Sequence, residues 1–308
     1  MDSKPLVSIV TPLYNQSRYV EDTIKSVLDQ TYEHIEYIVV NDGSTDGSSE
    51  IIEKYRGKIT IIEQHNSGQA TALNNGWTAA TGEIFSYLSA DDLLLPDCIK
   101  TLVEALQNDI GAVCAYPNCN LISDRSIELK RGVAQRFDLE QLLVEQECYI
   151  GPGPLWRAAA HRDIGGWKPE LKLAPDREFW IRLSSHGRFL FIDRTLASYR
   201  LHSESTSYKV TSEIVSLEYV KVLDEYYNSA KESDPGYHRK AEAYAHAYLL
   251  IARNLLREWK IPRTMHYLKL AHKTFPKSIS IHSMAILLRS ALGKPVRLAI
   301  KFFAGREK

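Results

Sequence analysis

The chain has 308 residues, of which 44% are hydrophobic and 25% are charged. These values are ordinary for a soluble globular protein with one large domain, or with one domain and a smaller companion. The zero net charge hides an uneven distribution. Residues 237–308 contain 15 Lys and Arg against 3 Asp and Glu, whereas residues 1–236 contain 23 basic and 35 acidic side chains. An acidic body is therefore joined to a basic tail, and no nucleic-acid partner is expected.

The cysteines and the lengths of the apolar runs indicate the cellular compartment of the protein. The four cysteines (Cys98, Cys114, Cys119 and Cys148) include no Cys-x-x-Cys pair, and we expect buried thiols rather than a disulfide scaffold. The opening segment has no basic stretch followed by an apolar one, as a secretory signal would. No uncharged apolar run reaches the roughly 18 residues that a spanning helix needs. We therefore expect a cytoplasmic protein.

In chain order, the first hundred residues alternate between two hydrophobic periods. Runs rich in β-branched residues predict strands at 6–10, 35–40, 59–63 and 83–89. The segments between them carry helical stripes at 17–30, 47–55 and 68–81. This alternation predicts βαβ units and a mostly parallel sheet with helices on both faces.

The second half of the chain is less regular. Residues 111–116 and 188–202 read as further strands, and residues 175–187 read as a helix. From about residue 211 onward the pattern is helical. The sequence therefore predicts an α/β body followed by an all-α region.

Polar clusters follow three of the predicted strands. They are TPLYN after the first strand, NDGSTD after the second and SADD after the fourth. In open α/β sheets, ligands bind beyond the carboxyl ends of the strands. We therefore expect the functional site at this edge of the sheet.

The segment YLSADDLLLP places two adjacent carboxylates, Asp91 and Asp92, between two apolar stretches. Such a pair at a strand end suits a hard divalent cation, which prefers oxygen ligands. The alternative is an exposed turn in which Asp92 caps the following helix. Spacing alone does not separate these two interpretations.

The segment NDGSTDGSS offers Asp42 and Asp46 beyond the second strand. Asp42 could accept hydrogen bonds from a ribose or a base, whereas Asp46 is better placed as a helix cap. The first strand-to-helix turn, TPLYNQS, has no glycine and no G-x-G-x-x-G, which argues against a dinucleotide-binding fold.

Three further polar residues have a structural as well as a functional interpretation. Asp176 begins a helix after a proline, where an acidic residue is common. Arg200 could bind a phosphate with its forked guanidinium. His202 could ligate a metal or donate to a phosphate, or it could be a satisfied histidine at a strand end.

Taken together, the motifs resemble those of family 2 glycosyltransferases with a GT-A fold. Seven segments occur in the family's order and cover residues 5–207, about two thirds of the chain: VSIVTPLYN, VVNDGSTDGS, GQATALNNGW, YLSADDLLLP, GGW, APDREFWIRL and YRLHSESTS. Each motif alone is weak, but seven in order are highly specific. The resemblance implies an inverting transfer from a nucleotide-diphosphate sugar.

The resemblance also implies roles for individual residues on the donor side. Thr11, Pro12 and Tyr14 would line the nucleotide pocket, with Asp42 on the base or ribose. Asp91 matches the last Asp of the family's D-x-D motif and would contact both the nucleotide and the metal.

On the reacting side, the implied ligands of a divalent Mn²⁺ or Mg²⁺ are Asp91, Asp92 and His202. Asp92, Arg200 and His202 would hold the diphosphate of the donor, and Asp176 matches the catalytic base. Gly153, Trp156 and Trp167 are assigned to the acceptor region.

Three positions depart from the commonest family pattern. Ser89 stands where D-x-D begins, Leu73 replaces a frequent Arg, and Pro175 replaces a frequent acidic residue. These departures affect the assignment of the donor more than that of the reaction class.

We therefore interpret residues 1–210 as a Rossmann-like GT-A domain and residues 211–308 as a basic helical region. The expected activity is transfer of a sugar from a UDP-sugar to a hydroxyl of a glycan or lipid-linked acceptor, in the synthesis of cell-surface polysaccharide or glycolipid. The alternatives are a nucleotidyltransferase and a noncatalytic nucleotide-sugar-binding or scaffold protein.

The basic tail predicts docking on an anionic membrane, at the inner face of the plasma membrane. Its apolar side chains recur at helical spacing with basic residues between them, at Met284, Leu287, Leu288, Ala291 and Leu292. Basic amphipathic helices lie in membrane interfaces. The alternative is that these stripes pack on each other, or on a second subunit in a homo-oligomer.

Overall fold

The computed structural model divides the chain into two compact units. Unit 1 comprises Met1–Phe137 and Cys148–Ser205, and unit 2 comprises Asp138–Glu147 and Thr206–Lys308. The structure describes residues 4–202, 205, 211–281, 283, 285 and 287. The two units are treated separately below.

Unit 1 is an α/β unit built on a nine-stranded sheet. The strands are β1 (Val7–Leu13), β2 (Ile35–Asn41), β3 (Thr60–Glu63), β4 (Ile84–Tyr87), β5 (Leu93–Leu94), β6 (Ala112–Ser123), β7 (Glu128–Lys130), β8 (Leu155–Arg157) and β9 (Arg188–Leu201). The helices are α1 (Val20–Leu28), α2 (Ser48–Glu53), α3 (Gln69–Ala79), α4 (Cys98–Asn108), α6 (Ala158–Ile164) and α7 (Pro175–Leu183), followed by the short η1 (Ser184–His186).

The strand order is β3-β2-β1-β4-β8-β6-β9-β5, and β7 pairs with β6. β1, β2, β3 and β4 are mutually parallel, as the alternation of predicted strands and helices requires. β8 enters antiparallel between β4 and β6, while β9 runs parallel to β6. The predicted α/β class with a Rossmann-like, GT-A type sheet is confirmed, and the antiparallel strands β5, β7 and β8 make that sheet mixed.

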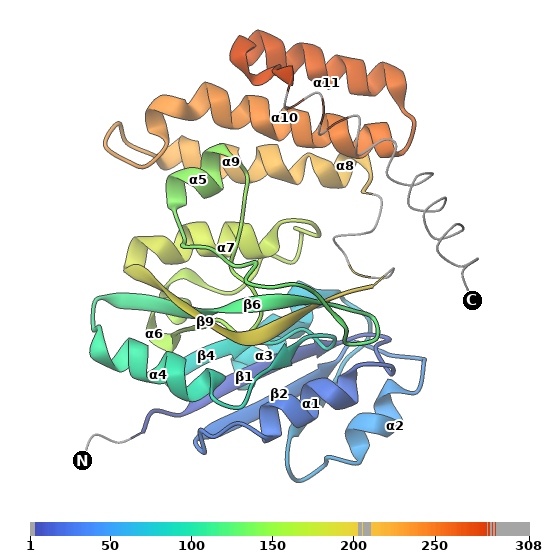
Figure 1. The fold of residues 1–308 in the computed structure, drawn as a ribbon, viewed down its shortest axis with the longest axis vertical. Helices are drawn as coiled ribbons and strands as arrows, with labels where there is room; N and C mark the ends of the chain where they lie inside the picture. Colours follow the sequence, from blue (N-terminus) through green and yellow to red (C-terminus); the bar gives the residue numbers. More distant parts are fainter. Residues whose placement is uncertain are drawn as a thin grey trace. The chain divides into compact units, whose positions relative to one another are not determined.

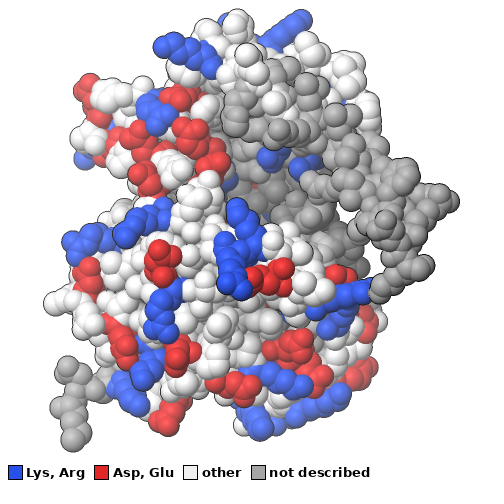
Figure 2. All heavy atoms as spheres, in the orientation of Figure 1, with Lys and Arg blue, Asp and Glu red and all other residues white. Residues whose placement is uncertain are grey.

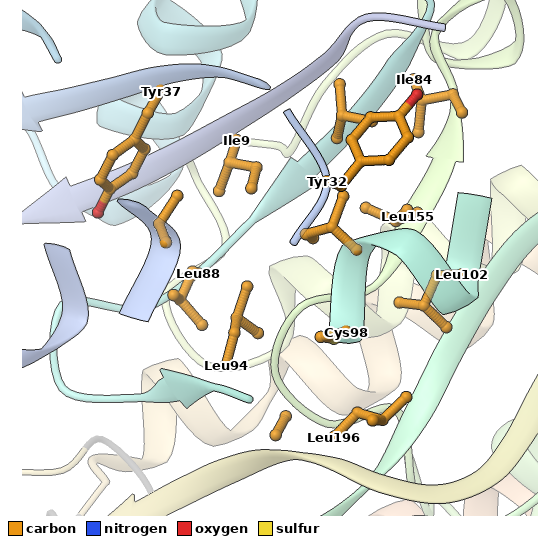
Figure 3. Close-up of a cluster of buried hydrophobic side chains, with 14 of the residues drawn as sticks. Ile9, Tyr32, Tyr37, Ile84, Leu88, Leu94, Cys98, Leu102, Leu155 and Leu196 are labelled. Atoms are coloured by element: carbon orange, nitrogen blue, oxygen red, sulfur yellow. The ribbon is translucent and has the colours of Figure 1, made fainter. Parts of the chain in front are cut away.

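The two faces of the sheet are covered by different helices, because successive side chains of a strand point to opposite faces. On one face, Ile9 and Val39 join the apolar side chains of α1 and α4 in a single cluster (Figures 1 and 3). On the other face, Val10 and Val40 lie against Gly76 of α3. A Cβ at position 76 would overlap Val10, so glycine allows this helix to approach the sheet closely.

A two-residue strand brings distant parts of unit 1 together at the ligand-binding edge. β5 follows the acidic pair directly and pairs antiparallel with β9, with Leu93 opposite Ser198 and Leu94 opposite Ala197. Asp91 and Asp92 therefore lie beside the end of β9, a strand about a hundred residues away in sequence. The alternative interpretation, in which Asp92 caps the following helix, is wrong, because β5 intervenes and α4 begins only at Cys98.

Unit 2 is helical in the part that the structure describes. It contains α5 (Leu139–Val144), α8 (Glu213–Ser216), α9 (Glu218–Ser229), η3 (Tyr237–Arg239), α10 (Lys240–Arg257), α11 (Ile261–Thr274) and η4 (Pro276–Ser278). Arg239 contacts carboxylate oxygens of Glu140, Glu145 and Glu242 at 2.8–3.0 Å, which ties the segment around α5 to α10. None of the described helices is both long enough and apolar enough to cross a bilayer.

Only part of the predicted tail stripe falls within the described residues. Leu287 is 4% exposed and packs in a cluster with Ile251, Leu255 and Tyr267, so this residue faces the helical core. Met284, Leu288, Ala291 and Leu292 lie outside the described residues.

The interior of unit 1 contains a buried histidine, which makes the stability of the fold sensitive to pH. His161 lies among Trp77, Phe85 and Trp156, and its Nδ1 accepts a hydrogen bond from Trp156 Nε1 at 3.3 Å. Burial lowers the pKa of His161 to about 4, and the nearby charges of Arg182 and Arg162 add to this effect. The unfolded chain, with an ordinary histidine pKa near 6.5, therefore binds more protons in this interval.

We predict that the free energy of unfolding falls as the pH is lowered from about 6.5 to about 4, with His161 contributing a slope of up to about 1.4 kcal/mol per pH unit. His161→Asn should reduce this slope, whatever its effect on absolute stability, and the exposed His34→Gln should leave it unchanged. The measurement is urea unfolding at several pH values. A slope that His161→Asn leaves intact would assign the pH dependence to other groups.

Candidate functional site

The site begins with a pair formed by Asp91 and His202. Asp91 lies on the segment between β4 and β5, and its Oδ2 is 2.8 Å from Nε2 of His202, just beyond β9. The His202 ring is also 4.9 Å from the ring of Tyr19. The Asp91 carboxylate retains 17% exposure, whereas the His202 side chain is almost completely enclosed. The pair therefore presents one accessible carboxylate, oriented by a buried imidazole.

Asp92 and Arg200 form the support beneath this pair. Asp92 is 3% exposed, and its Oδ1 accepts a hydrogen bond from the backbone N–H of Arg200 at 2.8 Å. Burial, followed by the neighbouring charge of Asp91, raises the pKa of Asp92. The Arg200 side chain donates through Nε to the carbonyl oxygen of Asp91 and through Nη1 to Ser126 Oγ, both at 2.8 Å. These contacts fix the backbone that carries both carboxylates.

The guanidinium of Arg200 is not fully satisfied by the described residues. The residue is 1% exposed, and its Nη2 is a buried donor with no hydrogen-bond partner among them. Leaving a buried donor unpaired is costly, and more so when it is charged. An anionic ligand would supply the missing acceptor.

Tyr87, at the end of β4, lies within electrostatic reach of two of the predicted site residues. Burial raises the pKa of its phenol, and the charge of Asp176 adds more to this rise than that of Asp92. Asp176 lies in the first turn of α7. Burial raises the pKa of Asp176, and the neighbouring positive charge of Arg177 acts in the opposite direction. The predicted metal-side and base-side carboxylates therefore both influence the same phenol.

A clamped loop carries Trp167 to Tyr87, with ring centroids 5.1 Å apart. Asn74 of α3 holds the loop from one side: its Oδ1 accepts the Trp167 N–H at 2.9 Å, and its Nδ2 donates to the Trp167 carbonyl at 2.7 Å. A Cβ at Gly166 would overlap Asn74, which explains the glycine there. The indole Nε1 of Trp167 is buried without a hydrogen-bond partner among the described residues.

Helix α7 holds the other side of the same loop. Arg182 donates to the carbonyl oxygens of Ile164, Gly165 and Gly166, and it pairs with Glu178 one turn earlier, at 2.6 Å. Asp176 begins the helix that carries this clamp. The position of the base candidate and that of the loop are therefore coupled through α7.

The predicted nucleotide-side residues lie at the ends of β1 and β2. Thr11 is fully buried, and its hydroxyl is 3.0 Å from that of Tyr37, while Pro12 is buried in the same strand. Tyr14 is 46% exposed. Asp42 is 3% exposed, and its carboxylate accepts hydrogen bonds from Gln64 Nε2, Ser67 N and Gly68 N. Of these four residues, only Tyr14 offers a large free surface.

Two of the three residues assigned to the acceptor region, Trp156 and Gly153, are explained by packing inside the unit. Trp156 is completely buried among Trp77, Phe179 and Trp180. Gly153 has a φ of 72°, and a Cβ there would overlap the side chain of Leu94. Trp167 is the member of this group whose ring lies against Tyr87.

Sequence reasoning missed Tyr87, Asn74 and Arg182. Asn74 had a usable signal, since asparagine is a poor helix former and the segment LNNGW puts two of them inside a predicted helix. The Glu178 and Arg182 spacing of four residues also indicated an ion pair on one helix face. Neither pattern revealed that both side chains would hold one loop.

The donor atoms of Asp91 and His202 fit a divalent cation. Carboxylate oxygen and imidazole nitrogen both ligate Mn²⁺-like ions. Adjacent ligands of an octahedral ion with bonds of about 2.1 Å lie about 3 Å apart, close to the 2.8 Å between these two atoms. Asp92 is directed instead to the Arg200 backbone, so the structure does not bring it together with the other two.

Among the described residues, a group of three potential ligands that converge within 4.8 Å occurs only in unit 2, at Glu145, Glu242 and His246. Both glutamates already bind Arg239. This cluster is therefore accounted for as an ion-pair network.

The comparisons with known proteins agree with this fold. Residues 8–153 match the model of Glycosyl transferase family 2. An uncharacterized glycosyltransferase of Rickettsia typhi is 33% identical over 66% of this chain and 66% of its own length. A second, from Haemophilus influenzae, is 30% identical over 67% of this chain and 69% of its own length. The chain belongs to glycosyl transferase family 2.

Longer relatives and solved structures extend the comparison. The chondroitin synthase of Pasteurella multocida is 29% identical over 67% of this chain, but the match spans only 22% of that synthase. Staphylococcus aureus TarS in complex with UDP-GlcNAc superposes with a TM-score of 0.59 at 15% identity, covering 90% of this chain and 93% of that one. The mannosyltransferase PcManGT of Pyrobaculum calidifontis, in complex with GDP-Man and Mn²⁺, superposes with a TM-score of 0.60 at 20% identity. The match covers 99% of this chain and 89% of that one. At these identities the structures show a shared fold.

We predict that Asp91→Asn abolishes the Mn²⁺-dependent part of nucleoside-diphosphate binding, because it removes the accessible carboxylate that would ligate the ion. Asp92→Asn is the matched control. Its amide oxygen can still accept the Arg200 N–H, so we expect metal-dependent binding to persist. Calorimetric titration of UDP with and without Mn²⁺ measures both. Unchanged Mn²⁺-dependent affinity in Asp91→Asn would rule Asp91 out as a ligand.

Proposed function

We propose that this protein is an inverting glycosyltransferase that moves a sugar from a nucleotide-diphosphate donor to an acceptor hydroxyl. One observation carries the proposal. The Asp91–His202 pair lies beyond the carboxyl end of β4, where α/β sheets bind their ligands, and the charge of Asp176 acts on Tyr87 at the end of that same strand. Membership of glycosyl transferase family 2 supports the reaction class.

The proposed donor side combines a cation with two supporting side chains. Asp91 and His202 would hold a divalent ion, which when bound neutralises charge on the leaving diphosphate. Arg200 would use its unpaired Nη2 to bind the diphosphate, and the exposed face of Tyr14 would contact the nucleotide. Asp42 supports the nucleotide pocket by fixing residues 64–68 through its three accepted hydrogen bonds.

On the acceptor side, Asp176 would act as the general base. It would take the proton of the attacking hydroxyl while the oxygen bonds to the anomeric carbon and the diphosphate leaves from the opposite face. A single displacement of this kind needs one base and inverts the anomeric configuration. Trp167, with its unpaired indole N–H beside Tyr87, would orient a sugar hydroxyl.

We propose a UDP-sugar as donor and a glycan or a lipid-linked saccharide as acceptor, in the synthesis of cell-surface polysaccharide or glycolipid. TarS in complex with UDP-GlcNAc supports the donor, and the chondroitin synthase relative supports a polysaccharide product. PcManGT with GDP-Man and Mn²⁺ supports a divalent cofactor, either Mn²⁺ or Mg²⁺.

Asp176→Asn tests the proposed base. We expect donor binding to be retained and kcat to fall by about 10²–10⁴-fold, the usual contribution of a general base. The exposed Asp163→Asn on α6 is the control and should keep its rate. Initial rates of sugar transfer, with UDP affinity measured in parallel, separate the two effects. If Asp176→Asn keeps more than about a tenth of the wild-type kcat, another group is the base.

The pH profile provides a second test of the same residue. Because burial raises the pKa of Asp176 and Arg177 lowers it, Arg177→Gln should raise that pKa further. A base must be deprotonated, so activity is lost as the pH falls through its pKa. The acid limb of kcat should therefore move to higher pH in Arg177→Gln, as measured by transfer rates across the pH range. A limb that stays in place or moves down would contradict the assignment.

A further inference from the structure

The outer face of α11 in unit 2 combines apolar and basic side chains. A helix turns about 100° per residue, so positions four apart lie on one face. Ile261, Met265, Lys269 and Lys273 are spaced in this way and are exposed. The opposite face carries Thr264, Tyr267 and Ala271, which are buried. The exposed face is therefore a defined surface of the helix, separate from the one that packs on α10.

The charged side chains of residues 259–281, which include α11, are all positive. Residues 259–281 contain five Lys and Arg and no Asp or Glu. Lys260 and Arg263 are paired with Glu258 and Glu213, whereas Lys269, Lys273 and Lys277 form no ion pair with any described residue. In Figure 2, blue and white atoms lie along the edge that α11 occupies in Figure 1. An unneutralised cationic surface of this kind favours an anionic partner.

Trp259 adds a large aromatic side chain to this surface. It lies between α10 and α11, is 67% exposed, and has a φ of 59° in the left-handed region. Bulky residues rarely adopt that conformation, and tryptophan is rarely left so exposed. Ile261 and Met265 next to it are 45% and 48% exposed. The turn and the first half of α11 thus present three apolar side chains to solvent, and unpaired lysines follow on the same helix.

We propose that this surface, formed by Trp259, Ile261, Met265, Lys269 and Lys273, binds an anionic phospholipid bilayer. The apolar side chains would enter the interface, where tryptophan is favoured, and the lysines would contact the lipid phosphates. A nucleic acid would use the lysines but not exposed Ile261 and Met265. The proposal concerns location and does not depend on the proposed transfer reaction.

Tryptophan fluorescence gives a direct readout of this contact. The other four tryptophans, Trp77, Trp156, Trp167 and Trp180, are 4% exposed or less, so Trp259 alone can reach lipid. With vesicles of brominated phosphatidylglycerol we expect quenching and a blue shift of the full-length protein's emission. Trp259→Phe should lose the quenching while still binding. Quenching that persists in Trp259→Phe, or no quenching in the wild type, would overturn the assignment.

Charge and apolar variants test the affinity in a vesicle-flotation assay. Because each lysine near an anionic surface strengthens binding about fivefold, the double variant Lys269→Gln/Lys273→Gln should weaken it roughly 30-fold. Met265→Gln should weaken binding at low and at high salt alike. Phosphatidylcholine vesicles should bind poorly, and salt should release the wild type from phosphatidylglycerol, because screening weakens exposed charge attraction.

The matched control is Lys54→Gln/Lys58→Gln, two exposed lysines of unit 1 that are also four residues apart. This pair should leave binding unchanged. Equal losses in the two double variants would indicate a nonspecific charge effect and reject the α11 surface. Sedimentation velocity tests whether the surface binds a second copy of the chain instead. A dimeric wild type and a monomeric Met265→Gln variant, with equal vesicle binding, would assign the surface to dimer formation and reject the membrane proposal.

Discussion

The buried hydrogen bonds of Arg200 are the constraint on which the candidate site depends. Its backbone N–H binds Asp92, its Nε binds the carbonyl of Asp91, and its Nη1 binds Ser126 in the turn between β6 and β7. The guanidinium also lies 4.9 Å over the ring of Tyr19, at the start of α1. One side chain at the end of β9 thus joins segments from across unit 1. Removing a buried charged partner is strongly destabilising, so these segments are held as a set.

A second support holds the opposite side of the site. Asn74 and Arg182 fix the loop of Trp167, and Asp176 lies on the same helix as Arg182. The base candidate and the carboxylate of Asp91 are therefore placed by different networks, one based on α7 and the other on β9. Tyr87 is influenced by the charge of Asp176, and burial raises the pKa of its phenol, which therefore stays protonated as a neutral hydrogen-bond donor.

Unit 2 differs from unit 1 in how it uses charge. Arg239 is paired with three glutamates, whereas Lys269 and Lys273 of α11 form no ion pair among the described residues. The apolar residues of this unit are also of two kinds. Tyr267 and Leu287 pack inside it, whereas Trp259 and Met265 are exposed. A helix face that combines unpaired lysines with exposed apolar side chains is suited to contact with another surface.

The sequence by itself determined the α/β class, the parallel start of the sheet and the edge at which the polar clusters gather. It could do so because the hydrophobic period and the polar residues at strand ends are local properties, and both are visible within residues 6–89.

Only the tertiary structure decided which of the clustered residues contact one another. Asp91 and Asp92 are neighbours in sequence, yet the first meets His202 and the second meets the Arg200 backbone, because β5 pairs with β9 in one register. Trp156 and Trp167 look alike as aromatic residues of the acceptor region, but β8 buries the first and the Asn74 clamp brings the second to Tyr87. Pairing register and packing depend on contacts between residues far apart in the chain, which local patterns do not encode.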